Sequence, residues 1–178
     1  MKGKKQIVLF VIMMILSSLY ENIYSSLNLE LMGPTYAKRP SDVDTTRVTS
    51  ATGLGLAIGI DLVNSRDVTL QLRGDISYYD FARNNSSSQA MFPAFFGFRV
   101  LLGDPSLTPW FLPFMESGYE IRFKDNFNNQ KGQDHGFVLG GGSEFYLTEE
   151  VYFGIHFRYH VFRSSFISIG PIIGYRFN

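Results

Sequence analysis

Apolar and polar residues alternate one by one over long stretches of this chain. In residues 151–162, V-Y-F-G-I-H-F-R-Y-H-V-F, the odd positions are apolar, whereas the even positions include Gly, His and Arg. Successive side chains of a β-strand point to opposite faces, so this segment is predicted to be a strand with one apolar and one mostly polar face. Residues 167–177 repeat the pattern after a break at 163–165. The two segments predict a β-hairpin.

The same alternation predicts six earlier strands, at residues 27–33, 53–63, 68–79, 92–102, 110–123 and 136–147. Long polar segments follow the first, third and fifth strands, at 34–50, 82–89 and 124–135, and the other connections are shorter. Strands of about ten residues cross a bilayer when tilted, and long loops at one end with short turns at the other are typical of outer-membrane barrels. We therefore predict an all-β fold: an eight-stranded antiparallel up-and-down transmembrane β-barrel.

The first 25 residues have the composition of a targeting segment. Three lysines lie within the first five residues, and an apolar run at 7–16 and two serines follow. A basic start, about ten apolar residues and small polar residues predict a secretory signal peptide. A permanent membrane anchor is the alternative, but a span needs about 20 apolar residues and Glu21 interrupts this one. We expect a signal peptide at 1–25, cleaved between Ser18 and Ser26, and a barrel domain at 26–178.

The distribution of charge indicates which face meets lipid. After the targeting segment the lysines are Lys38, Lys124 and Lys131, all in or beside the polar segments, whereas a soluble lipocalin-like barrel would carry lysine and glutamate on its outer face. The polar strand faces carry six acids and five arginines: Glu30, Asp61, Asp75, Glu116, Glu120, Glu144, Arg73, Arg99, Arg122, Arg158 and Arg176. Near-balanced charge suits an enclosed space, because an unpaired buried charge is costly. We predict lipid outside and polar side chains inside.

Aromatic residues and overall composition add two expectations. Aromatic residues near predicted strand ends are typical of interfacial girdles: Trp110, Tyr119, Phe123, Tyr152, Tyr159, Tyr175 and Phe177. The chain has no cysteine and a formal net charge of zero. Disulfides and thiolate metal sites are thus excluded, and no basic field indicates a nucleic-acid partner. We expect no cofactor.

Several stretches resemble a known family. They are G-G-G-S-E-F-Y-L-T-E-E-V-Y-F-G-I-H-F-R-Y-H at 140–160, P-F-M-E-S-G-Y-E at 113–120 and the ending G-Y-R-F-N. Over residues 27–178 the chain resembles the small OmpA/OmpX-like outer-membrane β-barrel proteins. The resemblance implies an integral protein of the Gram-negative outer membrane, surrounded by its lipid and recognised by the barrel-assembly machinery through the last strand. That family usually ends in Phe, whereas Asn178 follows Phe177 here.

The candidate site is a polar network in the lumen: Arg73, Asp75, Arg99, Glu116, Glu120, Arg122, Glu144, His156, Arg158, His160 and Arg176. Counting outward from the turn at 148–150, we expect Glu144 and Arg158 to lie at the same height and to pair. Eight strands enclose a space just wide enough for side chains, so a large pore is not expected. We therefore expect a non-enzymatic protein with a structural role, or a surface ligand bound through 34–50, 82–89 and 124–135.

A second function stays open because His156 and His160 share a face with nearby serines. With Ser164, Ser165 or Ser168 and with Glu144 as the acid, this set resembles the lipid A deacylases, although His160 is followed by Val-Phe-Arg and not by that family's His-x-Ser-Asn run. The alternative is therefore a lipid A deacylase-like hydrolase or a carrier of a small hydrophobic ligand. Metal binding by the two histidines is disfavoured, because Arg158 lies between them and would repel a cation.

Overall fold

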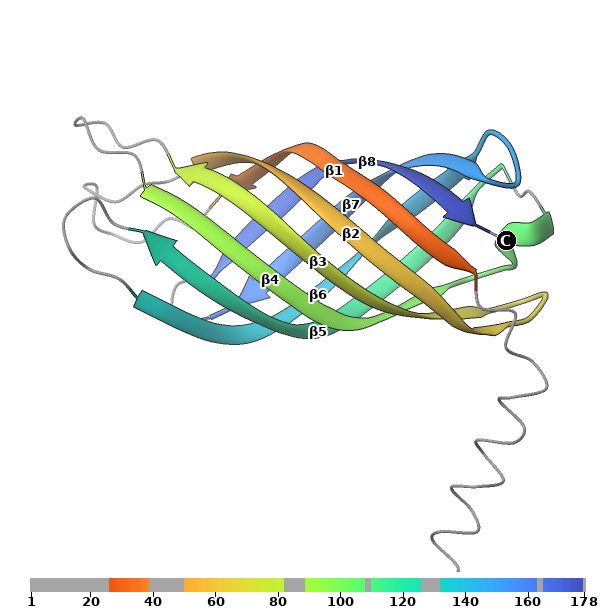
Figure 1. Cartoon of the computed structure of the whole chain (residues 1–178), viewed down its shortest axis with the longest axis horizontal. Coiled ribbons are helices and arrows are strands. Elements are labelled where there is room, and N and C mark those ends of the chain that lie inside the picture. Colours follow the sequence, from red (N-terminus) through yellow and green to blue (C-terminus); the bar gives the residue numbers. More distant parts are fainter. Residues whose placement is uncertain are drawn as a thin grey trace, which may run out of the picture.

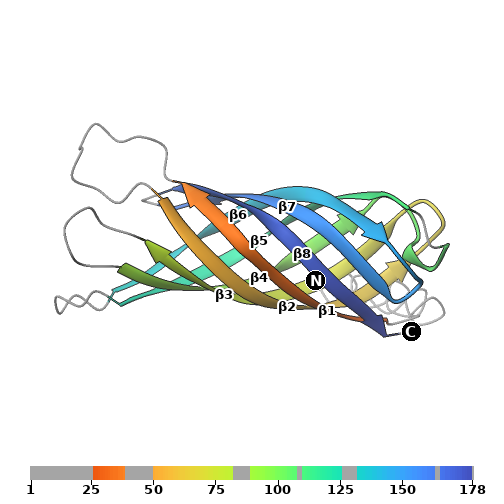
Figure 2. The same cartoon turned by 90° about the horizontal axis from the view of Figure 1, so that it is seen from above.

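The barrel predicted from the alternation is present. The computed structural model describes residues 26–38, 50–81, 89–107, 110–125, 132–162 and 165–177. Eight antiparallel strands close in sequence order, β1 pairing with β8 (Figures 1 and 2). They are β1 (Leu27–Lys38), β2 (Ser50–Asn64), β3 (Thr69–Phe81), β4 (Gln89–Leu101), β5 (Leu112–Asp125), β6 (Gly132–Tyr146), β7 (Val151–Val161) and β8 (Phe166–Phe177), with a short 3₁₀ turn, η1 (Pro105–Leu107), after β4.

The first strand is longer than the alternation predicts. The expected loop at 34–50 begins with Pro34, yet β1 continues through it to Lys38. The pairing with β2 shifts register between Met32 and Thr35, and Gly33 adopts a φ of +118° there. A bulge leaves Pro34 outside the regular ladder, which proline cannot complete because it lacks an N–H. Gly33 supplies the conformation that the bulge requires.

Other boundaries also move toward longer strands. β4 begins at Gln89, before the expected start at 92. β5 extends to Asp125 and β6 begins at Gly132, so both strands include residues of the expected loop at 124–135. The start of β5 moves the other way, since the strand begins two residues after Trp110. The remaining parts of the three expected loops, 39–49, 82–88 and 126–131, lie outside the described residues, as does the expected signal peptide at 1–25. In the described part of the chain, no helix has the length and apolar character to cross a membrane.

The two ends of the barrel differ. The start of β1 and the end of β8 lie at one end, on the right in Figure 1, together with the connections β2–β3, β4–β5 and β6–β7. We call this the terminal end. The connections that contain 39–49, 82–88 and 126–131 leave from the opposite, distal end. Because the strands are antiparallel and follow one another in sequence order, the connections after β1, β3, β5 and β7 all leave from the distal end.

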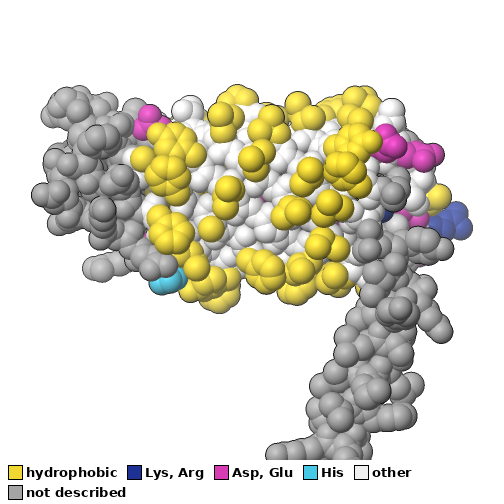
Figure 3. All heavy atoms as spheres, viewed as in Figure 1, with side chains coloured by type: hydrophobic (Ala, Val, Ile, Leu, Met, Phe, Trp, Pro, Cys, Tyr) yellow, Lys and Arg dark blue, Asp and Glu magenta, His cyan; other side chains and the backbone are white. Residues whose placement is uncertain are grey.

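The outer surface of the barrel carries apolar side chains along its length, as the face drawn in Figure 3 shows. Every strand alternates between an exposed outer face and a buried inner one, and the exposed large apolar residues come from all eight strands. Six of the seven expected girdle residues are exposed, with Trp110 at 79%. Tyr152 is the exception: it is buried and points into the lumen, because it lies on the same face of β7 as His156 and Arg158. Its assignment to a girdle was wrong.

Two glycines allow β4 and β5 to approach closely. Gly97 and Gly118 are paired opposite each other on the inner face. A Cβ at either position would collide with the backbone of the facing strand and with the ring of Phe95. The buried Phe95 ring occupies the space that the glycines leave, and the Arg158 guanidinium carbon lies 4.7 Å from its centroid. The glycines thus place an aromatic ring beside a buried arginine.

The connection between β4 and β5 allows a titration experiment. The hydroxyl and backbone N–H of Ser106 donate to Asp104 Oδ1 over 2.7 and 2.8 Å. Partial burial raises the pKa of Asp104, but these hydrogen bonds, a further one from Asn64 and the charge of Arg176 outweigh it and hold the pKa below its ordinary value. The stabilisation is therefore present above the ordinary Asp range, about pH 4, and is lost as the pH falls through the lower, folded-state pKa.

Ser106→Ala is expected to raise the pKa of Asp104, because the carboxylate loses the hydrogen bond from the Ser106 hydroxyl. An NMR titration of the Asp104 carboxyl carbon in detergent micelles measures the midpoint. Ser65→Ala is the control, since the Ser65 hydroxyl donates to the carbonyl of Val68 in the β2–β3 turn. Equal midpoints in the wild type and Ser106→Ala would show that the bonds do not act on Asp104.

Candidate functional site in the barrel lumen

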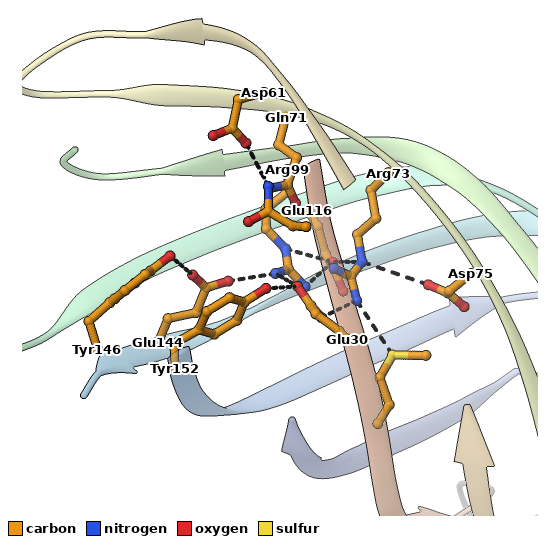
Figure 4. A network of polar contacts seen from close by, with 12 residues as sticks. Glu30, Asp61, Gln71, Arg73, Asp75, Arg99, Glu116, Glu144, Tyr146 and Tyr152 are labelled. Carbon is orange, nitrogen blue, oxygen red and sulfur yellow. Dashed lines mark hydrogen bonds and ion pairs between the residues drawn. The ribbon is translucent and has the colours of Figure 1, made fainter. Parts of the chain in front are cut away.

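Seven charged side chains from six strands form a central ion network in the lumen: Glu30, Arg73, Asp75, Arg99, Glu116, Glu144 and Arg158. All of them except Arg158 are labelled in Figure 4. Arg99 is the hub of the network. One guanidinium nitrogen, Nη1, lies 2.8 Å from Glu30 Oε1 and 2.6 Å from Glu144 Oε1, and Nη2 lies 3.2 Å from Glu116 Oε2. Arg99 is fully buried, so these bonds replace the water that it would otherwise bind.

The other two arginines extend the network along the lumen. Arg73 lies 2.6 Å from Glu30 and 3.5 Å from Glu116. Arg158 Nη2 lies 2.7 Å from Asp75, and its Nε donates to Glu116. Glu116 therefore contacts three guanidiniums, which come from β3, β4 and β7. A carboxylate among three arginines has its charge compensated from several sides.

Two tyrosine hydroxyls complete the network on the side toward the terminal end. Tyr152 donates to Glu30 Oε1 over 2.9 Å, and Tyr146 lies 2.9 Å from Glu144 Oε2. The two rings stack with centroids 5.0 Å apart. They belong to a buried apolar cluster that also contains Met32, Ala57, Leu101, Leu112, Phe114 and Ile172. Apolar packing thus closes the lumen beside the charges.

A second polar cluster surrounds Asp61 near the terminal end. Its carboxylate accepts hydrogen bonds from Ser26, Asn28 and Gln71, at 3.1 Å from Asn28 and 3.0 Å from Gln71. Arg176 Nη2 lies 2.8 Å from the same carboxylate. The ends of β1, β2, β3 and β8 are therefore held to one buried charge.

A third polar cluster lies toward the distal end. Glu120 contacts Arg122 Nε at 3.0 Å and His160 Nδ1 at 2.9 Å, and His160 Nε2 lies 2.9 Å from Ser168 Oγ. The carboxylate can only accept, so Nδ1–H donates to it and Nε2 accepts from the hydroxyl of Ser168. The Phe166 ring stacks on His160 at 3.9 Å. A hydroxyl, an imidazole and a carboxylate are thus held in a line.

Aromatic and apolar side chains cover this distal cluster. The guanidinium carbon of Arg122 lies 3.2 Å from the ring centroid of Phe162 and 4.4 Å from that of Phe166. A second buried apolar cluster consists of Ala37, Ala51, Tyr79, Met91 and Phe166. The described lumen is therefore filled with side chains toward both ends. That filling, together with the apolar exterior, places lipid outside the barrel.

The chain has the fold of the small outer-membrane β-barrels. Neisserial surface protein A has a TM-score of 0.55 and 14% identity, over 85% of this chain and 95% of that one. The attachment invasion locus protein Ail of Yersinia pestis has a TM-score of 0.54 and 11% identity, over 86% and 97%. The outer membrane protein OprG from Pseudomonas aeruginosa has a TM-score of 0.51 and 13% identity, over 88% and 97%. No protein-family model and no curated protein matches the chain.

All eleven residues of the expected network are buried in this outer-membrane-type barrel, but ten of them divide among three clusters and His156 belongs to none. Arg73, Asp75, Arg99, Glu116, Glu144 and Arg158 are central, Arg176 is near the terminal end, and Glu120, Arg122 and His160 are distal. His156 is buried as well, and neither of its ring nitrogens has a hydrogen-bond partner among the described residues.

The expected pair Glu144–Arg158 is not formed. Glu144 is opposite Gly154 in the β6–β7 pairing, whereas Arg158 is opposite Gly140, so the two residues lie four positions apart along the barrel. Glu144 binds Arg99 from β4, and Arg158 binds Asp75 from β3 and Glu116 from β5. Long side chains reach across the lumen to strands that are not their neighbours.

Several members of the clusters were not among the residues of the expected network: Glu30, Asp61, Gln71, Tyr146, Tyr152 and Ser168. Ser168 was expected only as one of three candidate serines of the hydrolase alternative. Glu30 and Asp61 lie on the polar faces of predicted strands, and the charge alternation alone could have included them. Tyr146 lies on the same strand face as Glu144, and Tyr152 on the same face as His156. Their even positions in the alternation could therefore have predicted that both tyrosines point into the lumen.

The distal line of Ser168, His160 and Glu120 has the order and spacing of a hydrolase triad, but with Glu120 in place of the expected Glu144. A nucleophile must also be reached by its substrate. Ser168 is 0% exposed, and the stacked Phe166 ring covers His160. No group of three or more metal-binding side chains occurs within the described ranges. The arrangement as it stands orients hydrogen bonds in the lumen and leaves no access to the hydroxyl.

Proposed function

We propose that this protein is an integral, non-enzymatic barrel of the Gram-negative outer membrane that presents its distal loops to a surface ligand. The observation that carries the proposal is the filled lumen. Three polar clusters and two apolar ones occupy the described interior. A barrel closed by its own side chains is suited to be a rigid anchor and not a wide channel.

The arrangement of the ends supports this orientation. In outer-membrane barrels the short turns face the periplasm and the longer loops face outward. The terminal end carries the described short turns, so residues 34–50, 82–89 and 124–135 would contribute the outer surface. Outer-membrane lipid and the barrel-assembly machinery are the other proposed partners, the latter through the aromatic residues of β8.

Peptide tags at Ser87 and Asn128 are expected to bind antibody on intact cells, because both positions belong to distal connections. A tag after Asn178 is expected to bind only after the outer membrane is opened. Flow cytometry before and after permeabilisation measures both. Antibody access to the C-terminal tag alone on intact cells would mean that the barrel is inserted in the opposite sense.

The function is tested by replacing the three distal loops with short Gly-Ser linkers while all eight strands are kept. Ail, one of the similar barrels, has also been solved with the heparin analogue sucrose octasulfate, which supplies a surface probe. If the loops carry the function, the intact barrel binds this or another cell-surface polyanion, and the loopless barrel folds without binding. If the loopless barrel restores detergent resistance to cells lacking the protein, the role is structural and the loop proposal fails.

A hydrolase is the second candidate, because Ser168, His160 and Glu120 are aligned. A lipid A deacylase-like activity would be abolished by Ser168→Ala without a change in folding. We expect no activity in the wild type, since the hydroxyl is sealed within the lumen. Mass spectrometry of lipid A from cells with wild-type or Ser168→Ala protein decides the question. Loss of an acyl chain that depends on Ser168 would make the protein an enzyme.

A further inference from the structure

The central ion network contains one carboxylate more than it has guanidiniums. Its four acids, Glu30, Asp75, Glu116 and Glu144, face three arginines, Arg73, Arg99 and Arg158. Outside this network, Arg176 lies beside Asp61 and Arg122 beside Glu120, so neither arginine is part of the central balance. An uncompensated charge in a poorly hydrated interior is costly, and such a group becomes neutral instead.

His156 is poorly placed to supply the missing positive charge. Both of its ring nitrogens are buried and lack a hydrogen-bond partner among the described residues. A charged ring would present two N–H donors with no carboxylate to accept them. It would also face the positive charges of Arg158, Arg73 and Arg99, against one carboxylate, that of Glu116. The excess must therefore be removed at one of the four acids.

Glu144 has the least compensation of the four. Glu116 contacts three guanidiniums, and Glu30 contacts two and the hydroxyl of Tyr152. Asp75 lies 2.7 Å from Arg158 and 3.8 Å from Arg73. Glu144 also has one tyrosine hydroxyl, that of Tyr146, but it contacts a single guanidinium nitrogen, Arg99 Nη1, and shares that nitrogen with Glu30.

We propose that Glu144 is a proton-binding site in the lumen. Its Oε1 accepts from Arg99. The Tyr146 hydroxyl donates to Oε2 over 2.9 Å when the carboxyl is ionised, and a rotation of this hydroxyl lets its oxygen accept from Oε2–H when the carboxyl is protonated. The groups around it come from five strands: Glu30 (β1), Arg73 (β3), Arg99 (β4), Tyr146 (β6) and Tyr152 (β7). With this proton bound, the central ion network has three carboxylates and three guanidiniums and is electrically neutral.

Replacing each acid by glutamine tests the proposal. In Glu144→Gln the amide oxygen can accept from Arg99 and the amide nitrogen can donate to Tyr146, as a protonated carboxyl does. We expect its urea-unfolding midpoint in phospholipid vesicles to equal that of the wild type or to exceed it. Glu116→Gln is the matched control, on the neighbouring strand and equally buried, and we expect its midpoint to fall because three guanidiniums lose a negative partner.

If Glu116→Gln fails to fold, the unfolding midpoints cannot be compared, and infrared spectroscopy in D₂O at neutral pH tests the proposal instead by detecting a protonated carboxyl directly. We expect the C=O band of a protonated carboxyl in the wild type and its loss in Glu144→Gln. Absence of the band from the wild type would overturn the proposal. So would a band that survives in Glu144→Gln but disappears in Glu30→Gln, or a midpoint for Glu144→Gln as low as that of Glu116→Gln.

Discussion

Arg99→Met lowers the free energy of unfolding by about 3–5 kcal/mol, the usual cost of removing one partner of a buried ion pair. Arg99 is fully buried and donates to Glu30, Glu116 and Glu144 at once. Methionine fills much of the volume but donates no hydrogen bond, so the carboxylates lose their shared partner. Urea unfolding of the barrel refolded into phospholipid vesicles measures the loss.

Arg176→Met is the control for this substitution. Arg176 is also buried and ion-paired, but its partner Asp61 keeps hydrogen bonds from Ser26, Asn28 and Gln71. We therefore expect a smaller loss than for Arg99→Met. Equal losses for the two variants would mean that the hub position of Arg99 in the central network has no energetic importance.

Gly118→Ala is expected to cost about 1–3 kcal/mol, the range for overpacking a filled interior. The added Cβ would collide with the backbone of Gly97 and of Phe96 on the facing strand and with the Phe95 ring. Backbone atoms cannot rotate away, so β4 and β5 must separate. Displacement of Phe95 would also disturb the buried Arg158 beside it.

Gly74→Ala provides the comparison for Gly118→Ala, because it adds the same methyl group to another strand, β3, on the outward face where there is room for it. A Cβ at Gly74 would meet its nearest heavy atom, the carbonyl oxygen of Phe95, at 3.7 Å, an ordinary contact. We expect its unfolding free energy to stay close to the wild-type value. A loss as large as that of Gly118→Ala would assign the effect to glycine content in general and not to the close approach.

The barrel could be predicted because the alternation of side chains depends on the strand alone. The inward and outward faces of 151–161 and 166–177 follow from their period of two and match the structure residue by residue. The residue at which β1 ends could not be predicted from the alternation. Pro34 normally ends a strand, and its acceptance here depends on a bulge made with β2.

Which charges meet inside the lumen could not be predicted from the period. Parity places Glu144 and Arg158 on the inner face, but their partners depend on the register of all the strands and on how far each side chain reaches across. The same holds for Ser168, which meets His160 through the β7–β8 pairing and the packing of Phe166. Sequence spacing gives the face of each residue but not its neighbour across the barrel.

The central network joins strands that are not neighbours, and this has a consequence for assembly. Glu30 on the first strand binds Arg73 on β3, Arg99 on β4 and Tyr152 on β7. An open sheet lacking the β1–β8 seam would expose arginines and carboxylates to acyl chains, where each unpaired charge is costly. Partly inserted sheets are therefore disfavoured, and the final seam forms together with the ion network. Insertion of this barrel is expected to be concerted, with the charges staying hydrated until the ring of strands is complete.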